Sequence, residues 1–276
     1  MSILTGWLLE NLCIWIPTLI ARFLVQVPDS DPNFLQLWIF FLQNGFIIVE
    51  GNFICQHFVL STAYKRVPRF SAHCSDNSVQ SMGILDFFKV MVPAQFLASA
   101  VFSWFIFQFL PKASVEAVLV LTSEFKYIPR LFPFLLRLFI VRVVVDVCFY
   151  GVHGILHLKK IYRAVHTTHH EHIKPTLWTN NHFSVLDLVL EGFLPFGIAL
   201  ATLELVGLQN SLVETYALLG HIMHYEIGSH SGTTARLISF FPPLSCVYPL
   251  LLGDVDKGNI FFHHCHHVYH RYNFGI

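Results

Sequence analysis

The chain has 276 residues, of which 54% are hydrophobic and only 12% are charged, and its mean hydropathy is +0.58. A soluble domain carries about 25% charged residues, so this composition disfavours a water-soluble globule and indicates that the chain folds in a lipid bilayer. Its 17 basic and 17 acidic residues cancel, which argues against nucleic acid as a partner.

Four apolar stretches precede most of the histidines, at 3–25, 34–60, 85–110 and 131–150. Each is close to the roughly 20 residues that a membrane-spanning helix needs, so we predict four spans. Charged side chains inside spans usually face the bundle interior or reach the interface. Those that interrupt these stretches are Glu10, Glu50, Lys89, Arg137, Arg142 and Asp146.

Two further apolar stretches and the N-terminus need separate interpretation. The apolar stretch 186–206 contains Pro195 and Gly197, so it either spans the membrane or forms a kinked or hairpin segment. The stretch 240–252 is too short to span and is expected to be interfacial or buried. The N-terminus lacks a basic leading region and a clear cleavage site, which predicts a retained helix and not a removed signal peptide.

Two basic segments suggest the orientation. One lies at 61–81 and the other contains Lys159, Lys160 and Arg163. Basic residues near spans favour the cytosolic side, and two spans separate these segments, so both are expected to face the cytosol. The six cysteines form no CxxC pair, which argues against a disulfide framework and a thiolate zinc site and favours a reducing environment.

Histidine is the unusual residue of this sequence. There are 17, and all but His57 and His73 lie at or beyond His153. Three groups have regular spacing: one HxxxH and two HxxHH. Spacings of three and four place side chains on one face of a helix. The eight histidines are His153, His157, His166, His169, His170, His263, His266 and His267.

Clusters of this kind are typical of metal sites, because neutral imidazole binds iron, zinc, copper and nickel. Eight nitrogens exceed the four to six ligands of one ion, so we predict two ions. Nitrogen-rich coordination with open positions suits iron that must bind O2. Zinc would fit the same ligands but has no redox chemistry.

These motifs resemble the fatty acid hydroxylase/sterol desaturase superfamily over residues 146–275. The segment 146–157 is similar to the first box and its lead-in, and 158–170 is very similar to the second box, with Pro175 following. His182 and Asp187 stand where members commonly have a histidine and an acidic residue. His230-Ser231-Gly232 resembles an element whose histidine is a further metal ligand. The last box continues to Asn273-Phe274-Gly275, as in the family.

The resemblance implies a non-haem di-iron oxygenase of the endoplasmic reticulum membrane with its active site facing the cytosol. Its substrate would be lipid-like, such as a sterol, a fatty acyl chain, a sphingoid base, or a terpenoid or polyketide. The reaction would be O2-dependent hydroxylation or desaturation of a C–H bond. Electrons would come from NAD(P)H through a separate carrier protein such as cytochrome b5.

The sequence therefore predicts an all-α, multi-span bundle with a cytosol-facing, histidine-rich helical cap. Residues 1–150 would supply the spans, and 151–276 would supply the metal-binding region of one integrated domain. The predicted ligands are the eight box histidines and His230. Residues expected to support them are Asp146, His182, His224 and Asn273. Asp146 lies two turns before His153 and could orient an imidazole, or it could pair with Arg142 one turn earlier.

The sequence departs from the family pattern at several places. Gly154 stands where members often have arginine, His264 replaces a common acidic residue, and His221 and His224 are additional. Members usually continue past the last motif with a Trp-Asp-containing tail, whereas this sequence ends at Ile276. Two alternatives therefore stay open. One is an inactive homologue that keeps the metal for structure; the other is a metal transporter, which would place its ligands within the spans.

Overall fold

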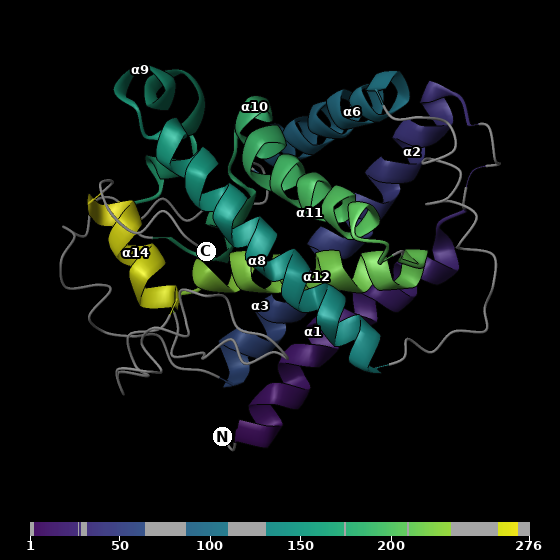
Figure 1. Cartoon of the computed structure of the whole chain (residues 1–276). Coiled ribbons are helices and arrows are strands. Elements are labelled where there is room, and N and C mark those ends of the chain that lie inside the picture. Colours follow the sequence, from purple (N-terminus) through teal and green to yellow (C-terminus); the bar gives the residue numbers. More distant parts are fainter. Residues whose placement is uncertain are drawn as a thin grey trace.

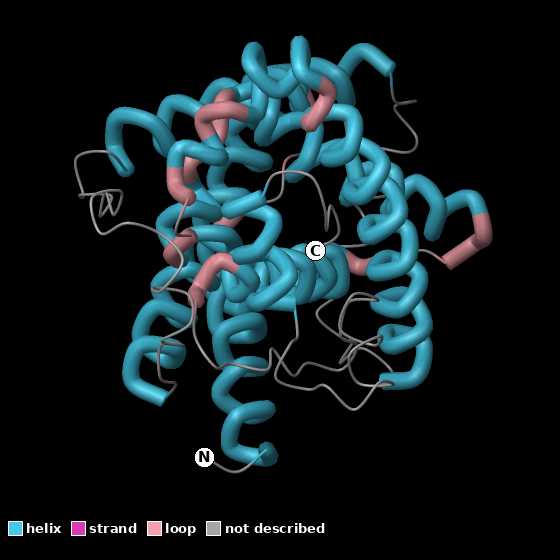
Figure 2. The backbone as a smooth tube through the Cα atoms, turned by 90° about the vertical axis from the view of Figure 1, so that its left-hand side faces the viewer, coloured by secondary structure: helices cyan, strands magenta, loops and turns pink. Residues whose placement is uncertain are grey.

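The structure is a computed structural model, and it describes residues 3–26, 28, 32–63, 87–109, 131–173, 175–208, 210–232 and 259–269. Within these ranges the secondary structure is helical, with no strand (Figure 2). The first half contains α1 (Ile3–Leu24), α2 (Phe34–Gly45), the π-helix η1 (Phe46–Glu50), α3 (Gly51–Ala63), the π-helix η3 (Phe87–Met91) and α6 (Val92–Phe109).

The second half contains the histidine-bearing elements. They are α8 (Leu131–Leu156), α9 (Lys159–Ile161), η4 (Tyr162–His166), η5 (His169–Glu171), η6 (Leu177–Asn181), α10 (Val185–Asp187), η7 (Leu188–Phe193), α11 (Leu194–Leu205), α12 (Leu212–Ser229) and α14 (Asn259–Tyr269). The prediction of an all-α fold is confirmed for the described residues. The short apolar stretch predicted at 240–252 lies outside them.

Among the residues that the structure describes, three helical segments are long and apolar enough to cross a membrane: Thr5–Leu24, Phe34–Val59 and Val185–Leu205. The first two match predicted spans, and the third shows that the Pro195-containing stretch is helical throughout. The third predicted span contains a shorter apolar helix, Phe88–Trp104. The fourth is helical as α8, but it carries three charged residues and is not among the candidates.

The charges of α8 are paired inside the bundle. Arg142 is 2% exposed and its Nη2 donates to Asp146 Oδ1 at 3.1 Å, while its guanidinium lies over the ring of Tyr225 in α12. Arg137 Nη1 donates to Glu214 Oε1 of α12, also at 3.1 Å. These contacts join α8 to α12. A charge that is buried with a partner costs far less than an isolated one.

Apolar faces form the rest of the bundle. On α8, the side chains buried against α11 and α12 follow helical spacing. They are Phe134, Leu138, Val141, Val145 and Phe149. The opposite face exposes Phe132, Leu136 and Val147, and α1 exposes Leu12, Leu19 and Phe23 in the same way. Outward apolar faces suit contact with lipid, so the chain is an all-α membrane bundle.

Helix α1 packs closely on α3 and α12 because glycine lies at each crossing. A Cβ added at Gly51 of α3 would meet Pro17 Cβ at 2.9 Å, and one added at Gly220 of α12 would meet Ile14 Cγ2 at 3.2 Å. Small residues at such crossings allow close backbone approach between membrane helices.

Local sequence fixes the turn that reverses the chain between α11 and α12. Gly207 has a positive φ of 74°, and the amide of Leu208 donates to the carbonyl of Leu203 at 2.8 Å. This arrangement closes α11 with the left-handed residue that glycine adopts readily. Ser211 and Glu214 then form a reciprocal capping box that starts α12. Helix α12 ends at Ser229 and His230 follows as its C-cap, so this turn helps set the position of a predicted ligand.

The histidine-bearing elements lie together at one side of the bundle. In Figure 1 the end of α8 that leads to α9, the C-terminal end of α12 and α14 gather on the left. Segments that are more than a hundred residues apart in sequence are thus neighbours there.

Candidate metal centre

The nine predicted ligands lie in two clusters. The five-histidine site contains His153, His157, His166, His170 and His266, and the four-histidine site contains His169, His230, His263 and His267. Within each cluster the candidate ligand atoms lie within 4.8 Å of one another. Eight of the nine side chains are buried, and His157 is half-buried.

The five-histidine site is closed by three segments. His153 is in the last turn of α8, and His157 follows that helix. His157 Nε2 lies 3.3 Å from His153 Nε2 and 3.1 Å from His266 Nε2 of α14. His170 Nε2 lies 3.1 Å from His166 Nε2 and 3.2 Å from His266 Nε2. The nitrogens therefore converge on one point.

The four-histidine site joins α12 and α14 to η5. His230 Nε2 lies 3.3 Å from His169 Nε2 and 2.7 Å from His263 Nε2. His267 Nε2 lies 3.2 Å from His263 Nε2. The ring of His169 also stacks on Phe183, with centroids 4.3 Å apart and planes only 4° from parallel, which holds the imidazole in place.

These separations fit metal coordination. Metal–imidazole bonds of about 2.0–2.1 Å place two nitrogens about 3.0 Å apart at 90° and about 3.4 Å apart at the tetrahedral angle. The observed separations run from 2.7 to 3.3 Å. The donor set is imidazole, which suits iron, zinc, copper and nickel. Both clusters could hold a metal ion.

Two hydrogen bonds fix which ring nitrogen faces the site. His166 Nδ1 donates to the carboxylate of Asp187, at 3.0 Å to Oδ1 and 2.9 Å to Oδ2. His230 Nδ1 donates to the backbone carbonyl of Glu226 at 2.7 Å. A proton on Nδ1 leaves the lone pair of Nε2 free, and such partners orient metal-binding histidines.

The local electrostatics favour the neutral form of six of the nine imidazoles. Burial lowers the pKa of His169 and His267 well below the usual value, and neighbouring imidazoles lower both further. Burial likewise lowers the pKa of His153, His170 and His263. It lowers the pKa of His230 to about 3, although the hydrogen bond to Glu226 acts in the opposite direction. Neutral imidazole is the form that binds metal.

This electrostatic arrangement predicts that acid destabilises the metal-free protein. The folded pKa values lie below the unfolded value of about 6.5, so the unfolded chain binds protons first as the pH falls. The contribution of these histidines to the free energy of unfolding is fully present above about pH 6.5. Below that pH the free energy of unfolding falls by about 1.4 kcal/mol per pH unit for each histidine that stays neutral in the fold. We expect a lower thermal midpoint at pH 5.5 than at pH 7.5 in detergent. An equal or higher midpoint at pH 5.5 would show that these imidazoles accept protons inside the fold.

A large apolar cavity reaches the metal centre. Its volume is about 570 Å³, and it is lined by His169, His230 and His263 of the four-histidine site. Its other walls include Phe102, Phe149 and Met223. A carbon chain or ring system placed there would lie against the metal site in a water-poor space.

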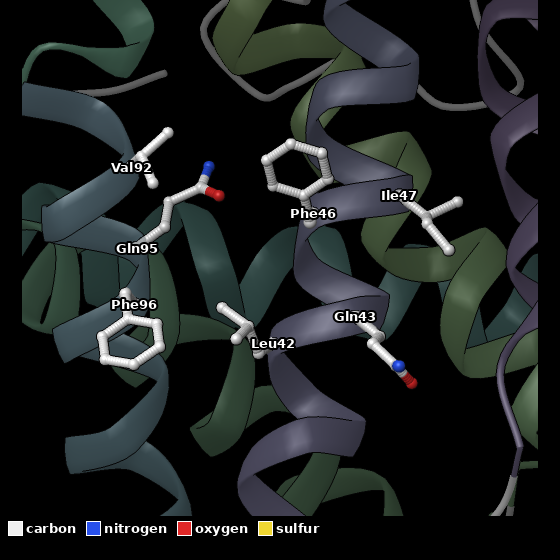
Figure 3. Close-up of a pocket in the computed structure, with 7 residues that line it drawn as sticks. All are labelled: Leu42, Gln43, Phe46, Ile47, Val92, Gln95 and Phe96. Carbon is white, nitrogen blue, oxygen red and sulfur yellow. The ribbon is translucent and has the colours of Figure 1, made fainter. Parts of the chain in front are cut away.

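A smaller cavity of about 310 Å³ adjoins the large one between α2–η1 and α6. Leu42, Phe46 and Gln95 line both. Figure 3 shows Gln95 extending from α6 towards Phe46 on the neighbouring helix. Phe46 and Phe96 are more than two-fifths exposed, so this cavity opens to the outer apolar face of the bundle.

The residues predicted to support the ligands take other positions. Asp146 pairs with Arg142, which is the alternative that its spacing allowed. His182 Nε2 donates to Glu171 at 3.0 Å, and the ring of His182 stacks on His172. His224 Nε2 lies 3.4 Å from Glu10 Oε2, between α12 and α1.

Neither of the two additional histidines of α12 belongs to the clusters: His221 Nδ1 donates to the Ala217 carbonyl. Asn273 lies outside the described residues.

Two acidic residues near the centre were not assigned a role from the sequence. Asp187 orients His166, and Glu191 Oε1 lies 3.9 Å from His153 Nε2. Both side chains are buried. One available signal was their position in an apolar stretch, because intramembrane carboxylates are costly and usually functional. For Asp187, the match to an acidic position of the family was a second signal.

Comparison with protein families gives one clear match: the model of the fatty acid hydroxylase family matches residues 138–276. Comparisons with curated proteins and with solved structures gave no match. The family match covers half of the chain and contains both histidine sites, as the resemblance of the boxes predicted. The chain therefore belongs to the fatty acid hydroxylase family, within the fatty acid hydroxylase/sterol desaturase superfamily.

Proposed function

We propose that this protein is a membrane di-iron oxygenase that hydroxylates or desaturates a C–H bond of a lipid-like substrate. The observation that carries the proposal is the convergence of two buried histidine sites beside one apolar cavity. Family membership supports a lipid hydroxylase or desaturase. When bound, two iron ions would supply the reduction of O2 and the oxidation of a C–H bond, chemistry that amino-acid side chains do not provide.

The protein's own contribution is to hold ligands, orient them and exclude water. The nine histidines would bind the two ions in neutral form, which is the form that binds metal. Burial lowers the pKa of six of them: His153, His169, His170, His230, His263 and His267. Asp187 and the Glu226 carbonyl fix the rings of His166 and His230. The apolar cavity would hold one carbon of the substrate near the four-histidine site, because proximity and orientation are large sources of rate. Zinc would fit the same nitrogens but would not support the reaction.

The smaller cavity supports entry of substrate from the bilayer. It opens on the outer apolar face between α2–η1 and α6 and shares Leu42, Phe46 and Gln95 with the cavity at the metal centre. We propose that sterol, acyl, sphingoid, terpenoid or polyketide substrates pass here without crossing water.

We further propose that the metal centre faces the cytosol from the endoplasmic reticulum membrane. Lys159, Lys160 and Arg163 are exposed next to the five-histidine site, and basic residues favour the cytosolic side. The same surface would receive electrons from NAD(P)H through cytochrome b5 or a similar separate carrier. An epitope inserted beside Lys160 should be accessible from the cytosol, and protection of it inside microsomes would contradict this orientation.

Lipid and metabolite profiling of a host with and without the protein tests the function. We expect a new compound that is heavier by one oxygen or lighter by two hydrogens than a host lipid. We also expect purified protein to hold about two metal ions per chain. An inserted protein that holds two ions but yields no oxidised compound would favour the inactive homologue.

A further inference from the structure

Glu191 is a buried acidic residue in an apolar helical segment. It lies in the π-helix η7, within the candidate span Val185–Leu205, and its side chain is 4% exposed. Short π-helical turns are rare and often occur at functional sites, because the widened turn redirects side chains. The nearby Asp187 already accepts a hydrogen bond from His166, and Glu191 takes no part in that contact.

The carboxylate of Glu191 faces the five-histidine site. Its Oε1 lies 3.9 Å from His153 Nε2, and its oxygen and the ligand atoms of His166 and Asp187 lie within 4.8 Å of one another. Glu191 also lines the large cavity. Among the described residues, Oε1 has no hydrogen-bond donor although it is shielded from solvent.

A buried carboxylate oxygen without a donor is costly unless a proton or a cation neutralises the carboxylate. Two imidazoles of the five-histidine site, those of His153 and His166, lie close enough to help hold such a cation. Imidazole binds a metal ion as a neutral ligand, so a divalent ion bound by imidazoles alone would keep its full charge in an apolar environment. A carboxylate beside the ion would offset both the cost of the buried carboxylate and the cost of the buried positive charge.

We propose that Glu191 is an additional ligand of the metal ion at the five-histidine site, approaching from the side of the cavity. This inference rests on the proposed function, since it requires metal at that site. Ligands on opposite sides of one ion lie up to about 4.2 Å apart when each bond is about 2.1 Å, so the 3.9 Å separation from His153 is compatible with one shared ion.

The assignment gives the two sites different ligand sets. Five imidazoles and one carboxylate provide six donors, whereas the other site has four histidines among the described residues. The four-histidine site would therefore keep open positions, and three of its histidines line the cavity. Glu191 would saturate one ion and leave the other accessible.

Competition for Zn²⁺ tests this inference without relying on activity. The full-length protein is purified in detergent, loaded with Zn²⁺ and titrated with a chelator of known affinity. We expect wild type to hold two ions and Glu191→Gln to hold one of them at least about tenfold more weakly, because even the outer partners of metal ligands contribute that much.

Glu50→Gln is the matched control. Glu50 is also 4% exposed in an apolar helical segment, but it accepts hydrogen bonds from Gln95 at 2.6 Å and Asn181 at 3.5 Å. Its substitution should leave both Zn²⁺ affinities unchanged. Equal weakening in this variant would assign the effect to lost buried charge, and that outcome would overturn the inference.

The outcomes separate this inference from the proposed function. Wild type that binds no Zn²⁺ would contradict the proposed function itself. Wild type and Glu191→Gln that both bind two ions with the same affinity would overturn only the role of Glu191. If the Gln variant does not accumulate, the same Zn²⁺ titration of Glu191→Asp tests the inference. Its shorter carboxylate should weaken one site, and unchanged binding at both sites would overturn the role.

Discussion

Replacing His169 or His267 with alanine is expected to lower product formation at least about 100-fold while the protein stays inserted and helical. Both side chains belong to the four-histidine site and are at most 2% exposed. His169 Nε2 lies 3.3 Å from His230 Nε2, and His267 Nε2 lies 3.2 Å from His263 Nε2. Loss of either nitrogen removes one of the four donors that the described residues supply to this site, so the ion would bind weakly or in a changed geometry.

Insertion should survive these substitutions because lipid burial and internal helical hydrogen bonds hold the spans. The assay is product per inserted protein, with helical content measured on the same samples. His57→Ala is the control, since His57 is exposed on α3 and outside both sites. Near-normal turnover in the His169 and His267 variants would show that the oxygenase assignment is wrong, however well the family matches.

The sequence allowed the histidine pairs to be predicted, because four-residue spacing is a local property. His153 and His157, His166 and His170, and His263 and His267 each share one site. The spacing did not predict which of the two sites the third histidine of each HxxHH box would join. His169 and His266 each join the site opposite to the pair in their own box. The step of one residue turns a side chain by about 100° on a helix, which explains the division.

The second box also differs from the single helix face that its spacing predicted. A π-helix ends at His166, a turn follows, and a 3-10 helix begins at His169. Such irregular turns depend on tertiary packing, and propensity is a weak guide to them. Their effect is functional here, because they let one short segment supply ligands to both sites.

Apolar length predicted the helices well but predicted the roles of charged residues poorly. The four apolar stretches are helical over most of their length. Asp146 illustrates the limit: its spacing allowed contact with either His153 or Arg142, and the structure pairs it with Arg142, one turn away. The partner of His166 is 21 residues away, and Glu191 lies 38 residues after His153. Contacts at such separations follow from the packing of whole helices, which periodicity does not encode.

Replacing Asp187 with asparagine is expected to weaken metal binding at the five-histidine site by about 10–100-fold. Both oxygens of the Asp187 carboxylate accept from His166 Nδ1, and both side chains are fully buried. Asparagine is uncharged and keeps one acceptor oxygen. Its amide would also favour a proton on the other ring nitrogen, and a protonated Nε2 cannot bind metal.

The matched control is Glu171→Gln, since Glu171 also accepts from a histidine, His182, at 3.0 Å. Its side chain is 57% exposed, and the pair lies outside both histidine sites. Screening by water makes such an exposed pair weak, so this variant should keep both metal affinities and wild-type product. Metal per chain is measured for both variants after dialysis against a graded series of chelator concentrations. If Asp187→Asn retains both ions as tightly as Glu171→Gln does, then the Asp187–His166 contact does not tune the metal site and serves only packing.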